Sequence, residues 1–203
     1  MEGHLNASNK SLLDTYDTQL ITLSKSLSHV RIDFVDRFIP FLSTNEGLIV
    51  FERETCSMTY QSQVLADDFE HSFLESRKKD VLTQRTNIGS HKDDYSFLMD
   101  GEPLKKFGSQ GQQKSFLIAL RLSQYDYLAK VTQIKPILLL DDIFDKLDDE
   151  RVERLTALLN DSSRFGQVFI TDARKERTSL LVKGKYKTKI FEIEKGKVNS
   201  YET

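Results

Sequence analysis

Two adjacent carboxylates stand at the end of an apolar run. Asp141 and Asp142 follow the four apolar residues 137–140 in the stretch PILLLDDIFDKLD. A continuous apolar run of this kind is typical of a parallel strand buried on both faces. Ligands of parallel sheets bind beyond the carboxyl ends of the strands, where a carboxylate commonly orients Mg²⁺ through water while substrate phosphates complete its shell. The alternative is that both aspartates only cap the following turn.

A second candidate site is the loop FGSQGQQKS, residues 107–115, which leads into a long apolar-patterned segment. A helix N-terminus there would offer unpaired backbone N–H groups and partial positive charge, both of which suit a phosphate. Ser109 would add a hydroxyl donor, and Gly111 would let the backbone approach closely. Taken alone, Ser109 is more typical of a simple N-cap, with Gln112 completing a capping box. The strand that ends in two acids makes the phosphate interpretation the stronger one.

Basic residues offer only permissive support for nucleic-acid binding. The four lysines at alternate positions from Lys183 to Lys189 would project from one face of a strand, where phosphate contacts would give affinity without sequence readout. The alternative is a lysine-protected edge strand. Further basic residues are equally compatible with a solvated surface; they are Arg77, Lys78, Lys79, Lys105 and Lys106.

The motif GSHKDD contains His91, Asp93 and Asp94, three residue types that can bind metals. On a strand, however, His91 and Asp93 would lie on one side and Asp94 on the other, which makes a poor chelate. A structural role, or a place at the edge of a nucleotide site, fits this motif better, and its chemistry stays open.

The elements that must position these residues begin with a helix from residue 11 to about 40, ended at or near Pro40. Its apolar residues follow spacings of three and four, as in a coiled-coil seam; they are Leu13, Tyr16, Leu20, Leu23, Leu27, Val30 and Phe34. One interpretation is an ordinary amphipathic helix packed on a core. The other is one limb of a helical arm, whose partner helix lies elsewhere in the chain or is missing from it.

The rest of the chain alternates helices and apolar strands. We expect strands within 47–60, a helix over 62–84 and a hairpin turn at Asp100-Gly101. The later elements follow in order: helix 110–130, strand 137–141, helix 149–160, strand 167–171, helix 174–182, strand 188–193, and strand 197–201 after a turn at Lys195-Gly196. This order predicts an α/β fold with a mostly parallel sheet and crossover helices.

The bulk composition describes a globular protein of one large or two small domains. The chain has 203 residues, 38% of them hydrophobic, and a net charge of −2, which excludes a wholly basic nucleic-acid binder. A single cysteine, Cys56, cannot form an internal disulfide and fits a reducing cytoplasm. No signal peptide or apolar run long enough for a membrane span is present, so we expect a cytoplasmic protein without membrane contact.

These motifs carry a family resemblance. SQGQ resembles the signature loop of ABC-type ATPases, and LLLLDDIFDKLD resembles their Walker B strand and D-loop. Together with GSHKDD and GQVFITDA, in this order, the blocks closely resemble the RecF family of bacterial recombination mediator ATPases from about residue 11 to 194. The resemblance implies the C-terminal lobe of an ABC/SMC-like ATPase head, residues 86–203, with a helical arm at residues 1–85.

The resemblance also assigns roles to residues. Asp141 would be the Walker B acid that supports Mg²⁺, and Asp142 occupies the position where many ABC ATPases place a glutamate general base. Ser109, Gly111 and Gln112 would contact the γ-phosphate of ATP bound to a partner subunit. Asp148 would be the D-loop acid facing that partner.

Three departures from the family pattern stand out. Asp142 is one methylene shorter than glutamate, which implies slow hydrolysis. The switch position reads Thr171-Asp172 rather than histidine, and none of His4, His29, His71 and His91 replaces it in sequence. No G-x-x-x-x-G-K-[ST] phosphate loop occurs, although the family carries one near its N-terminus. We therefore expect a truncated form that does not hydrolyse ATP alone.

Intact members of the family would dimerise around ATP, bind DNA near single-strand/duplex junctions, and work with recombination mediators to load recombinase during gap repair and the SOS response. Two alternatives remain. One is a fragment of another SMC-like repair ATPase, which would carry a longer coiled coil. The other is a non-catalytic module that regulates a full-length ATPase.

Overall fold

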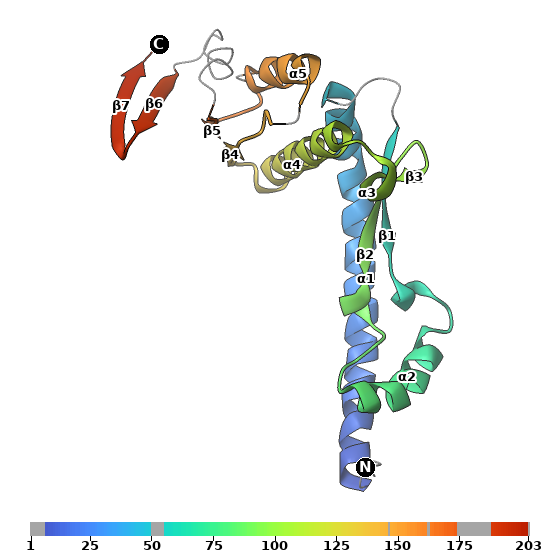
Figure 1. Ribbon diagram of the computed structural model, residues 1–203. Helices are drawn as coiled ribbons and strands as arrows, with labels where there is room; N and C mark the ends of the chain where they lie inside the picture. Colours follow the sequence, from blue (N-terminus) through green and yellow to red (C-terminus); the bar gives the residue numbers. More distant parts are fainter. Residues whose placement is uncertain (1–6, 50–54, 146, 162, 174–187, 203) are drawn as a thin grey trace. The chain divides into compact units, whose positions relative to one another are not determined.

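The computed structural model describes residues 7–49, 55–145, 147–161, 163–173 and 188–202 (Figure 1). The chain forms two compact units. The first unit comprises residues 1–39 and 57–98, and the second comprises residues 40–56 and 99–203. Among the described residues, none of the helices combines the length and the apolar composition needed to cross a bilayer.

A single helix, α1, spans Ala7–Ile49 and contains Pro40. The prediction that this helix ends at Pro40 was therefore wrong. A proline inside a helix removes one backbone hydrogen bond and costs about 3 kcal/mol. The turns after Pro40 are held by burial of Leu42 and Asn45, whose exposed fractions are 2% and 0%. The Asn45 side chain also donates to the Phe41 carbonyl at 3.0 Å. Packing in the second unit thus offsets the proline.

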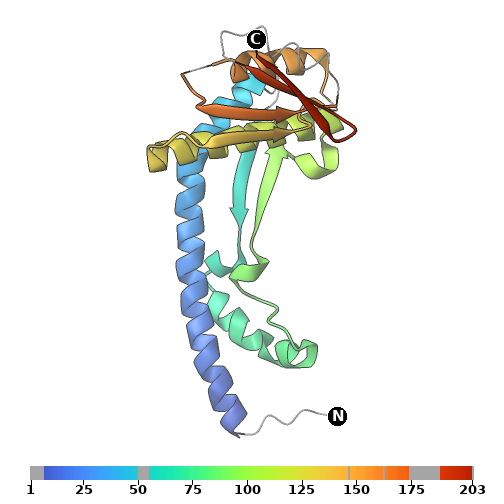
Figure 2. The same ribbon diagram turned by 90° about the vertical axis from the view of Figure 1, so that its left-hand side faces the viewer.

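The remaining elements of the first unit lie along one flank of α1 (Figure 2). They are β1 (Cys56–Gln61), the 3₁₀ helix η1 (Gln63–Leu65), α2 (Phe69–Thr83), the 3₁₀ helix η2 (Ser90–Lys92) and β2 (Asp94–Met99). A small core joins α2 to α1: it contains Val64, Phe69 and Phe73, with Ile21 and Ile88 against it. The predicted helix over 62–84 is therefore shorter than expected and begins at Phe69.

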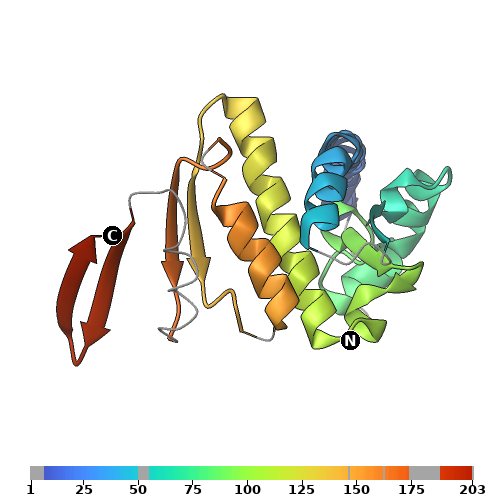
Figure 3. The ribbon, with the colours of Figure 1, turned by 90° about the horizontal axis from the view of Figure 1, so that it is seen from above.

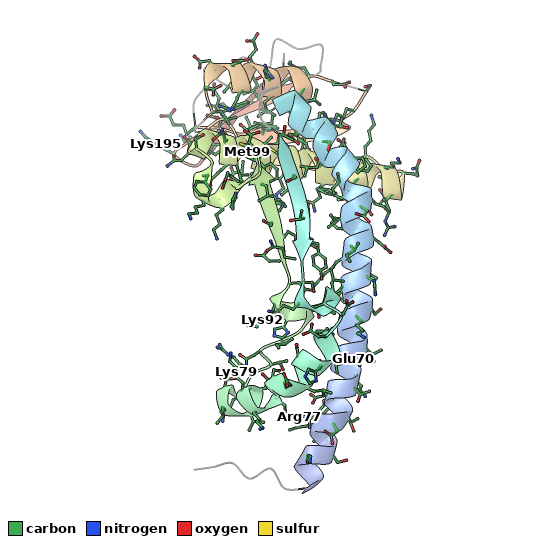
Figure 4. All side chains as sticks on the ribbon, turned by 90° about the vertical axis from the view of Figure 1, so that its right-hand side faces the viewer. Glu70, Arg77, Lys79, Lys92, Met99 and Lys195 are labelled. Atoms are coloured by element: carbon green, nitrogen blue, oxygen red, sulfur yellow. The ribbon has the colours of Figure 1, made fainter. Side chains whose placement is uncertain are left out.

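Ion pairs fix α2 to α1 as well. In Figure 4, Glu70 and Arg77 project from α2 toward α1. Lys25 Nζ lies 2.6 Å from Glu70, and Arg77 bonds both Asp14, at 2.5 Å, and Asp17. The hydrogen bonds that Arg77 donates to Asp17 and to Asp14 raise the pKa of its guanidinium above the usual value. The guanidinium is thus matched by two carboxylates of its own chain.

The expected turn at Asp100-Gly101 joins β2 to the short strand β3 (Glu102–Pro103) in a sheet of order β1-β2-β3. Both turn residues have positive φ, 52° for Asp100 and 83° for Gly101. This pairing of backbone angles is favoured in two-residue hairpins, where glycine and aspartate adopt it readily. The prediction is confirmed.

The second unit contains the predicted α/β arrangement. After α3 (Leu104–Phe107), its elements are α4 (Gln110–Thr132), β4 (Ile137–Asp141), α5 (Asp149–Leu159) and β5 (Gln167–Thr171). β4 and β5 pair in parallel with Ile137 opposite Gln167 and Asp141 opposite Thr171. A parallel pair joined through α5 is a crossover unit of the kind that the alternation of elements predicted.

The core of this unit lies between the strand pair and the two helices. α4 and α5 lie on the same face of β4 and β5 (Figure 3). Leu138 and Leu140 of β4 point into this core and meet Leu122 of α4 and Leu155 of α5. The opposite face of the pair is exposed: Ile137, Leu139 and Phe169 retain 60%, 71% and 48% of their accessible surface.

The chain continues, after the undescribed residues 174–187, as an antiparallel hairpin of β6 (Lys189–Glu194) and β7 (Lys197–Glu202). Its turn residues Lys195 and Gly196 both have positive φ, 49° and 78°. The hairpin confirms the two strands and the turn expected there. The helix expected over 174–182 lies outside the described residues.

Candidate functional site

Asp141 and Asp142 lie at the carboxyl end of β4, and both are exposed. Asp141 is the last residue of the strand and lies opposite Thr171 of β5. The Thr171 hydroxyl donates to Asp141 Oδ1. The other carboxylate oxygen of Asp141 has no hydrogen bond within the described part of the chain, and it is therefore open to a ligand or to water.

The backbone of Asp142 adopts an uncommon conformation. Its φ is +46°, a value that non-glycine residues rarely adopt except at turns and functional sites. Two hydrogen bonds hold it there. Its N–H donates to the Thr171 carbonyl at 3.1 Å, and its carbonyl accepts from Lys114 Nζ at 3.2 Å. The neighbouring strand and α4 thus fix how the chain leaves β4.

Apolar residues anchor the segment after the acid pair. Ile143, Phe144 and Leu147 are buried, with exposed fractions of 6%, 0% and 7%. Asp142 and Asp148, on either side, remain exposed. Ile143, Phe144 and Leu147 therefore anchor this segment in the core, while Asp142 and Asp148 on either side lie at the surface.

Asp148 caps the N-terminus of α5. Its side chain accepts from the Arg151 backbone N–H at 2.9 Å and forms an ion pair with the Arg151 guanidinium. Burial pushes the pKa of Asp148 upward, but the hydrogen bonds from Arg151 outweigh it and leave the pKa below its ordinary value. In the chain by itself, the predicted D-loop acid therefore works as an N-cap.

The start of α4 contains the predicted capping box. Ser109 N–H donates to Gln112 Oε1 at 2.7 Å, and Gln112 N–H donates to Ser109 Oγ at 3.2 Å. No partner is found, within the described residues, for the backbone N–H groups of Gln110 and Gly111. The hydroxyl of Ser109 accepts in this box, so its hydrogen can still be donated. The helix start therefore offers two amides and one hydroxyl hydrogen to an anion.

Glycine is needed immediately before this helix. A Cβ on Gly108 would lie 2.6 Å from Leu104 Cδ1 and 2.7 Å from the Leu104 carbonyl oxygen. The Gly108 carbonyl also accepts from Gln113 Nε2 at 2.8 Å. Close packing against α3 therefore sets where α4 begins.

The structure brings only some of the predicted site residues together. Asp141 and Asp142 share one edge with Thr171, and Lys114 links that edge to α4, the helix that begins at the predicted signature loop. Sequence reasoning missed Lys114: a lysine on an amphipathic helix carries no signal of its own. Thr171 was noted only as a departure from histidine, although its register opposite Asp141 could have indicated a contact.

An open groove continues from this edge along α4 and β4, lined by Lys114, Leu117, Arg121, Ile137, Leu139 and Asp141 among others. No group of three or more His, Cys, Asp or Glu side chains in the described ranges is arranged to hold a metal ion by itself. A cation at Asp141 would need ligands from water or a substrate, as Mg²⁺ commonly takes.

The three residues of GSHKDD do not converge. Asp93 has a buried side chain, 3% exposed, which bonds Arg31 Nη1 at 2.7 Å and the Ser62 hydroxyl at 2.5 Å. The His91 ring nitrogen Nε2 lies 2.9 Å from the Thr86 carbonyl. Asp94 instead accepts from the Tyr95 N–H. The motif therefore cross-links the first unit, and it forms no chelate.

The basic residues considered for nucleic-acid binding differ in their surroundings. Arg77 is matched by Asp14 and Asp17, whereas Lys78 and Lys79 are exposed. Of the lysines at 183, 185, 187 and 189, only Lys189 lies within the described residues. Its ammonium lies over the Phe191 ring, 5.6 Å from the ring centroid. The alternation expected over 183–187 lies outside the described residues.

Comparison with known proteins places the chain. No family model matches it. It is 44% identical, over 191 residues, to the DNA replication and repair protein RecF of Cytophaga hutchinsonii, a match that covers 94% of this chain and 50% of the relative. The RecF of Flavobacterium johnsoniae is also 44% identical, over 89% of this chain and 50% of the relative. The chain thus spans about half the length of the curated relatives it matches.

Solved structures agree on the fold. A structure of the recombination mediator protein RecF-ATP in the RecFOR pathway matches 98% of this chain and 52% of its own, with a TM-score of 0.74 and 22% identity. A structure from work on SMC ATPases matches 84% of this chain with a TM-score of 0.50 and 14% identity. At these identities the likeness shows the fold, that of a lobe of an ABC/SMC-like head. The sequence matches and the fold together show that this chain belongs to the RecF family.

Proposed function

We propose that this chain contributes the signature, Walker B and D-loop elements of a RecF-type ATPase that acts in DNA replication and repair. The observation that carries the proposal is the edge at β4. There an exposed Asp141, a fixed Asp142 and the helix of the signature loop are linked in a chain 44% identical to RecF. The phosphate loop would come from the part of the family's sequence that lies outside the matched half.

Asp141 would support Mg²⁺ through its open carboxylate oxygen, with water and nucleotide phosphates as the other ligands. The bound ion would neutralise charge on the transferred phosphate. Asp142 would orient the attacking water, because its backbone is fixed by Thr171 and Lys114 while its carboxylate remains exposed. Asp148 would face the partner subunit, and for this its carboxylate would give up or share the hydrogen bond with which it caps α5.

Ser109, Gly111 and Gln112 would serve ATP held by a second subunit. The open amides of Gln110 and Gly111 and the Ser109 hydroxyl suit a γ-phosphate at a helix N-terminus. Two heads related by a two-fold axis would then share two nucleotides. ATP would hold the dimer together, because these groups gain their phosphate only when the two heads close.

The test uses this chain combined with the complementary half, by which we mean the part of the Cytophaga hutchinsonii relative that lies outside the match. Ser109→Arg should block the approach of the second subunit, so the assembled protein should bind ATP but neither dimerise nor hydrolyse it. Ser109→Thr keeps a capping hydroxyl and is the matched control. Sedimentation with a slowly hydrolysed ATP analogue reads out the dimer. Normal dimerisation of Ser109→Arg would show that Ser109 is only an N-cap.

The DNA-binding part of the proposal concerns single-strand/duplex junctions, with recombination mediators and recombinase as further partners. We also propose that the chain divides into a helical arm, residues 1–85, and a head, residues 86–203. If the lysines near the C-terminus contact DNA, Lys185→Gln with Lys187→Gln should lower the slope of log affinity against log salt by roughly 0.9 per lost duplex contact. The control is Lys195→Gln with Lys197→Gln, and an unchanged slope would favour an edge strand guarded by lysines.

A second candidate is a non-catalytic module that binds and regulates a full-length ATPase. It is favoured by the lack of a phosphate loop in the sequence. The two candidates differ in one measurement: an ATPase half combined with the complementary half should hydrolyse ATP, whereas a regulatory module should lower the activity of an intact ATPase.

A further inference from the structure

Lys114 lies one turn after the start of α4 and contacts the edge that carries the acid pair. Its Nζ donates to the Asp142 carbonyl oxygen at 3.2 Å. Gln110, the first residue of α4, is four residues earlier and therefore lies on the same face of the helix. In Figure 3 the beginning of α4 and the carboxyl ends of β4 and β5 lie at the same end of the second unit. One helical turn thus connects the predicted signature loop with the acid pair.

The backbone of Asp142 depends on its neighbours. Its φ of +46° is a left-handed conformation, which is unfavourable for a residue with a Cβ atom. The bond from its N–H to the Thr171 carbonyl restrains the nitrogen side of the residue. The bond from Lys114 restrains the carbonyl side. Loss of the lysine would therefore remove the restraint on the peptide group that follows Asp142.

This backbone also directs the Asp142 side chain. The carboxylate is exposed, and within the described residues no hydrogen bond holds its oxygens. A general base must lie within hydrogen-bond reach of the water that it activates, so its direction matters as much as its charge. The two backbone bonds are therefore the contacts through which the protein can orient this carboxylate.

We propose that Lys114 is a positioning residue, which orients Asp142 for hydrolysis and makes that orientation depend on the state of the signature loop. The proposal rests on the proposed function. There, the start of α4 binds the phosphate of a nucleotide held by the partner subunit, whereas Asp142 serves the nucleotide at its own edge. A phosphate that draws the start of α4 toward it also moves Lys114, one turn along the same helix, and with it the Asp142 carbonyl. The base at each site then responds to the nucleotide at the other.

The Lys114 bond has a strength that suits such a relay. It joins an ammonium to an exposed carbonyl, and a hydrogen bond of this kind changes an equilibrium constant by roughly three- to tenfold. A lysine reaches its acceptor through a flexible stem, so a small shift of the helix can tighten or release the bond. The bond can thus bias the conformation of Asp142 without locking it.

The first experiment measures the backbone of Asp142 in this chain alone, by amide hydrogen exchange resolved with NMR. Lys114→Met keeps the apolar stem and removes the donor, so the Asp142 amide should exchange about three- to tenfold faster. Lys114→Arg restores a donor and should restore the rate. Lys135→Met is the matched control, because Lys135 Nζ donates in the same way to the Ser163 carbonyl, at 2.5 Å. Equal exchange in Lys114→Met and the unmodified chain would overturn the positioning role.

The second experiment measures catalysis by the chain assembled with the complementary half. Lys114→Met should bind ATP and dimerise normally, yet hydrolyse ATP at least about tenfold more slowly in a single turnover, because a misplaced base loses rate without losing affinity. Lys114→Arg should stay within about threefold of the unmodified protein, and Lys135→Met should match it. Weaker ATP binding by Lys114→Met would overturn the proposal, since it would assign Lys114 a direct contact with the nucleotide.

The relay itself is tested in the dimer formed with a slowly hydrolysed ATP analogue, by hydrogen exchange followed with mass spectrometry. Dimerisation should slow exchange at Asp142 by at least about tenfold more in the unmodified protein than in Lys114→Met. Both proteins dimerise, so cover by the partner is the same and the difference reports the lysine bond. An equal gain in protection would overturn the relay. If the assembled protein does not hydrolyse ATP at all, the proposed function fails, while exchange in the chain alone still decides whether Lys114 positions Asp142.

Discussion

Thr171 contacts both acids at the end of β4 with different atoms. Its hydroxyl donates to the Asp141 carboxylate, and its carbonyl accepts the Asp142 N–H. Because Thr171 lies opposite Asp141 in the parallel register, both bonds follow from strand pairing. Lys114 adds a third bond from α4. The position and backbone of the acid pair are thus set by two neighbouring elements.

Asp142→Asn, in this chain assembled with the complementary half, should leave ATP binding in place and slow hydrolysis. The amide keeps the size of the side chain but cannot accept a proton from water, and loss of a general base costs about 10²–10⁴ in rate. Single-turnover kinetics would measure the effect. Asp145→Asn makes the same charge change in the same loop and should hydrolyse normally. An unchanged rate in Asp142→Asn would place the base elsewhere.

Asp148 is the residue whose structural role can be measured in the chain alone. Asp148→Ala should lower the free energy of unfolding by about 1 kcal/mol at neutral pH, because it removes the α5 N-cap. Asp148→Asn keeps a capping oxygen and should lose less. The folded pKa of Asp148 lies below its ordinary value of 3.8, so its stabilisation is present above that pH and is lost as the pH falls through the folded pKa. Urea unfolding at neutral and acidic pH would show whether the difference shrinks.

At the scale of elements, α1 shows what the sequence could and could not predict. Its helical period could be predicted from the apolar spacing. The strands and helices from residue 110 to 171 were predicted to within one or two residues, because their local pattern and their packing agree. The end of α1 could not be predicted, because the burial of Leu42 and Asn45, a tertiary effect, offsets the helix-breaking tendency of Pro40. The buried face of α1 could not be predicted either, because Ser24 and Ser28 carry no apolar signal, whereas the exposed leucines do.

Asp93 links several segments of the first unit, because its carboxylate accepts hydrogen bonds from Arg31, Tyr60 and Ser62. Asp93→Ala would leave Arg31 without its carboxylate in a partly buried position, and the loss of one partner of a buried pair costs about 3 kcal/mol or more. The free energy of unfolding should fall by about that amount. Asp94→Ala changes the exposed neighbour and should stay within about 0.5 kcal/mol. Urea unfolding followed by circular dichroism would compare them, and equal effects would mean that the network is not a main support.

Across the whole molecule, apolar surface is exposed in both units. Leu20, Leu23 and Leu27 of α1 are exposed in the first unit. In the second, the open face of β4 and β5 exposes Ile137 and Leu139. Parallel sheets are normally covered on both faces, so this face has the composition of a buried surface. The sequence likewise contains the acid pair and the loop proposed as a signature without a phosphate-loop motif.

The isolated chain should therefore bind ATP weakly or not at all. A phosphate loop supplies a nest of backbone N–H groups that forms most contacts to the α and β phosphates. In the proposed function, the open amides of Gln110 and Gly111 would serve a different phosphate. Calorimetry on the chain alone should give a dissociation constant for ATP of about 1 mM or weaker, which is the affinity expected from a few hydrogen bonds to one phosphate. The chain combined with the complementary half should bind at least about 100-fold more tightly. Adding Asp141→Asn to that complex should weaken binding only in the presence of Mg²⁺, because the lost carboxylate acts through the ion. Sub-micromolar binding by the chain alone would contradict this account, since it would require a phosphate site that these residues do not form.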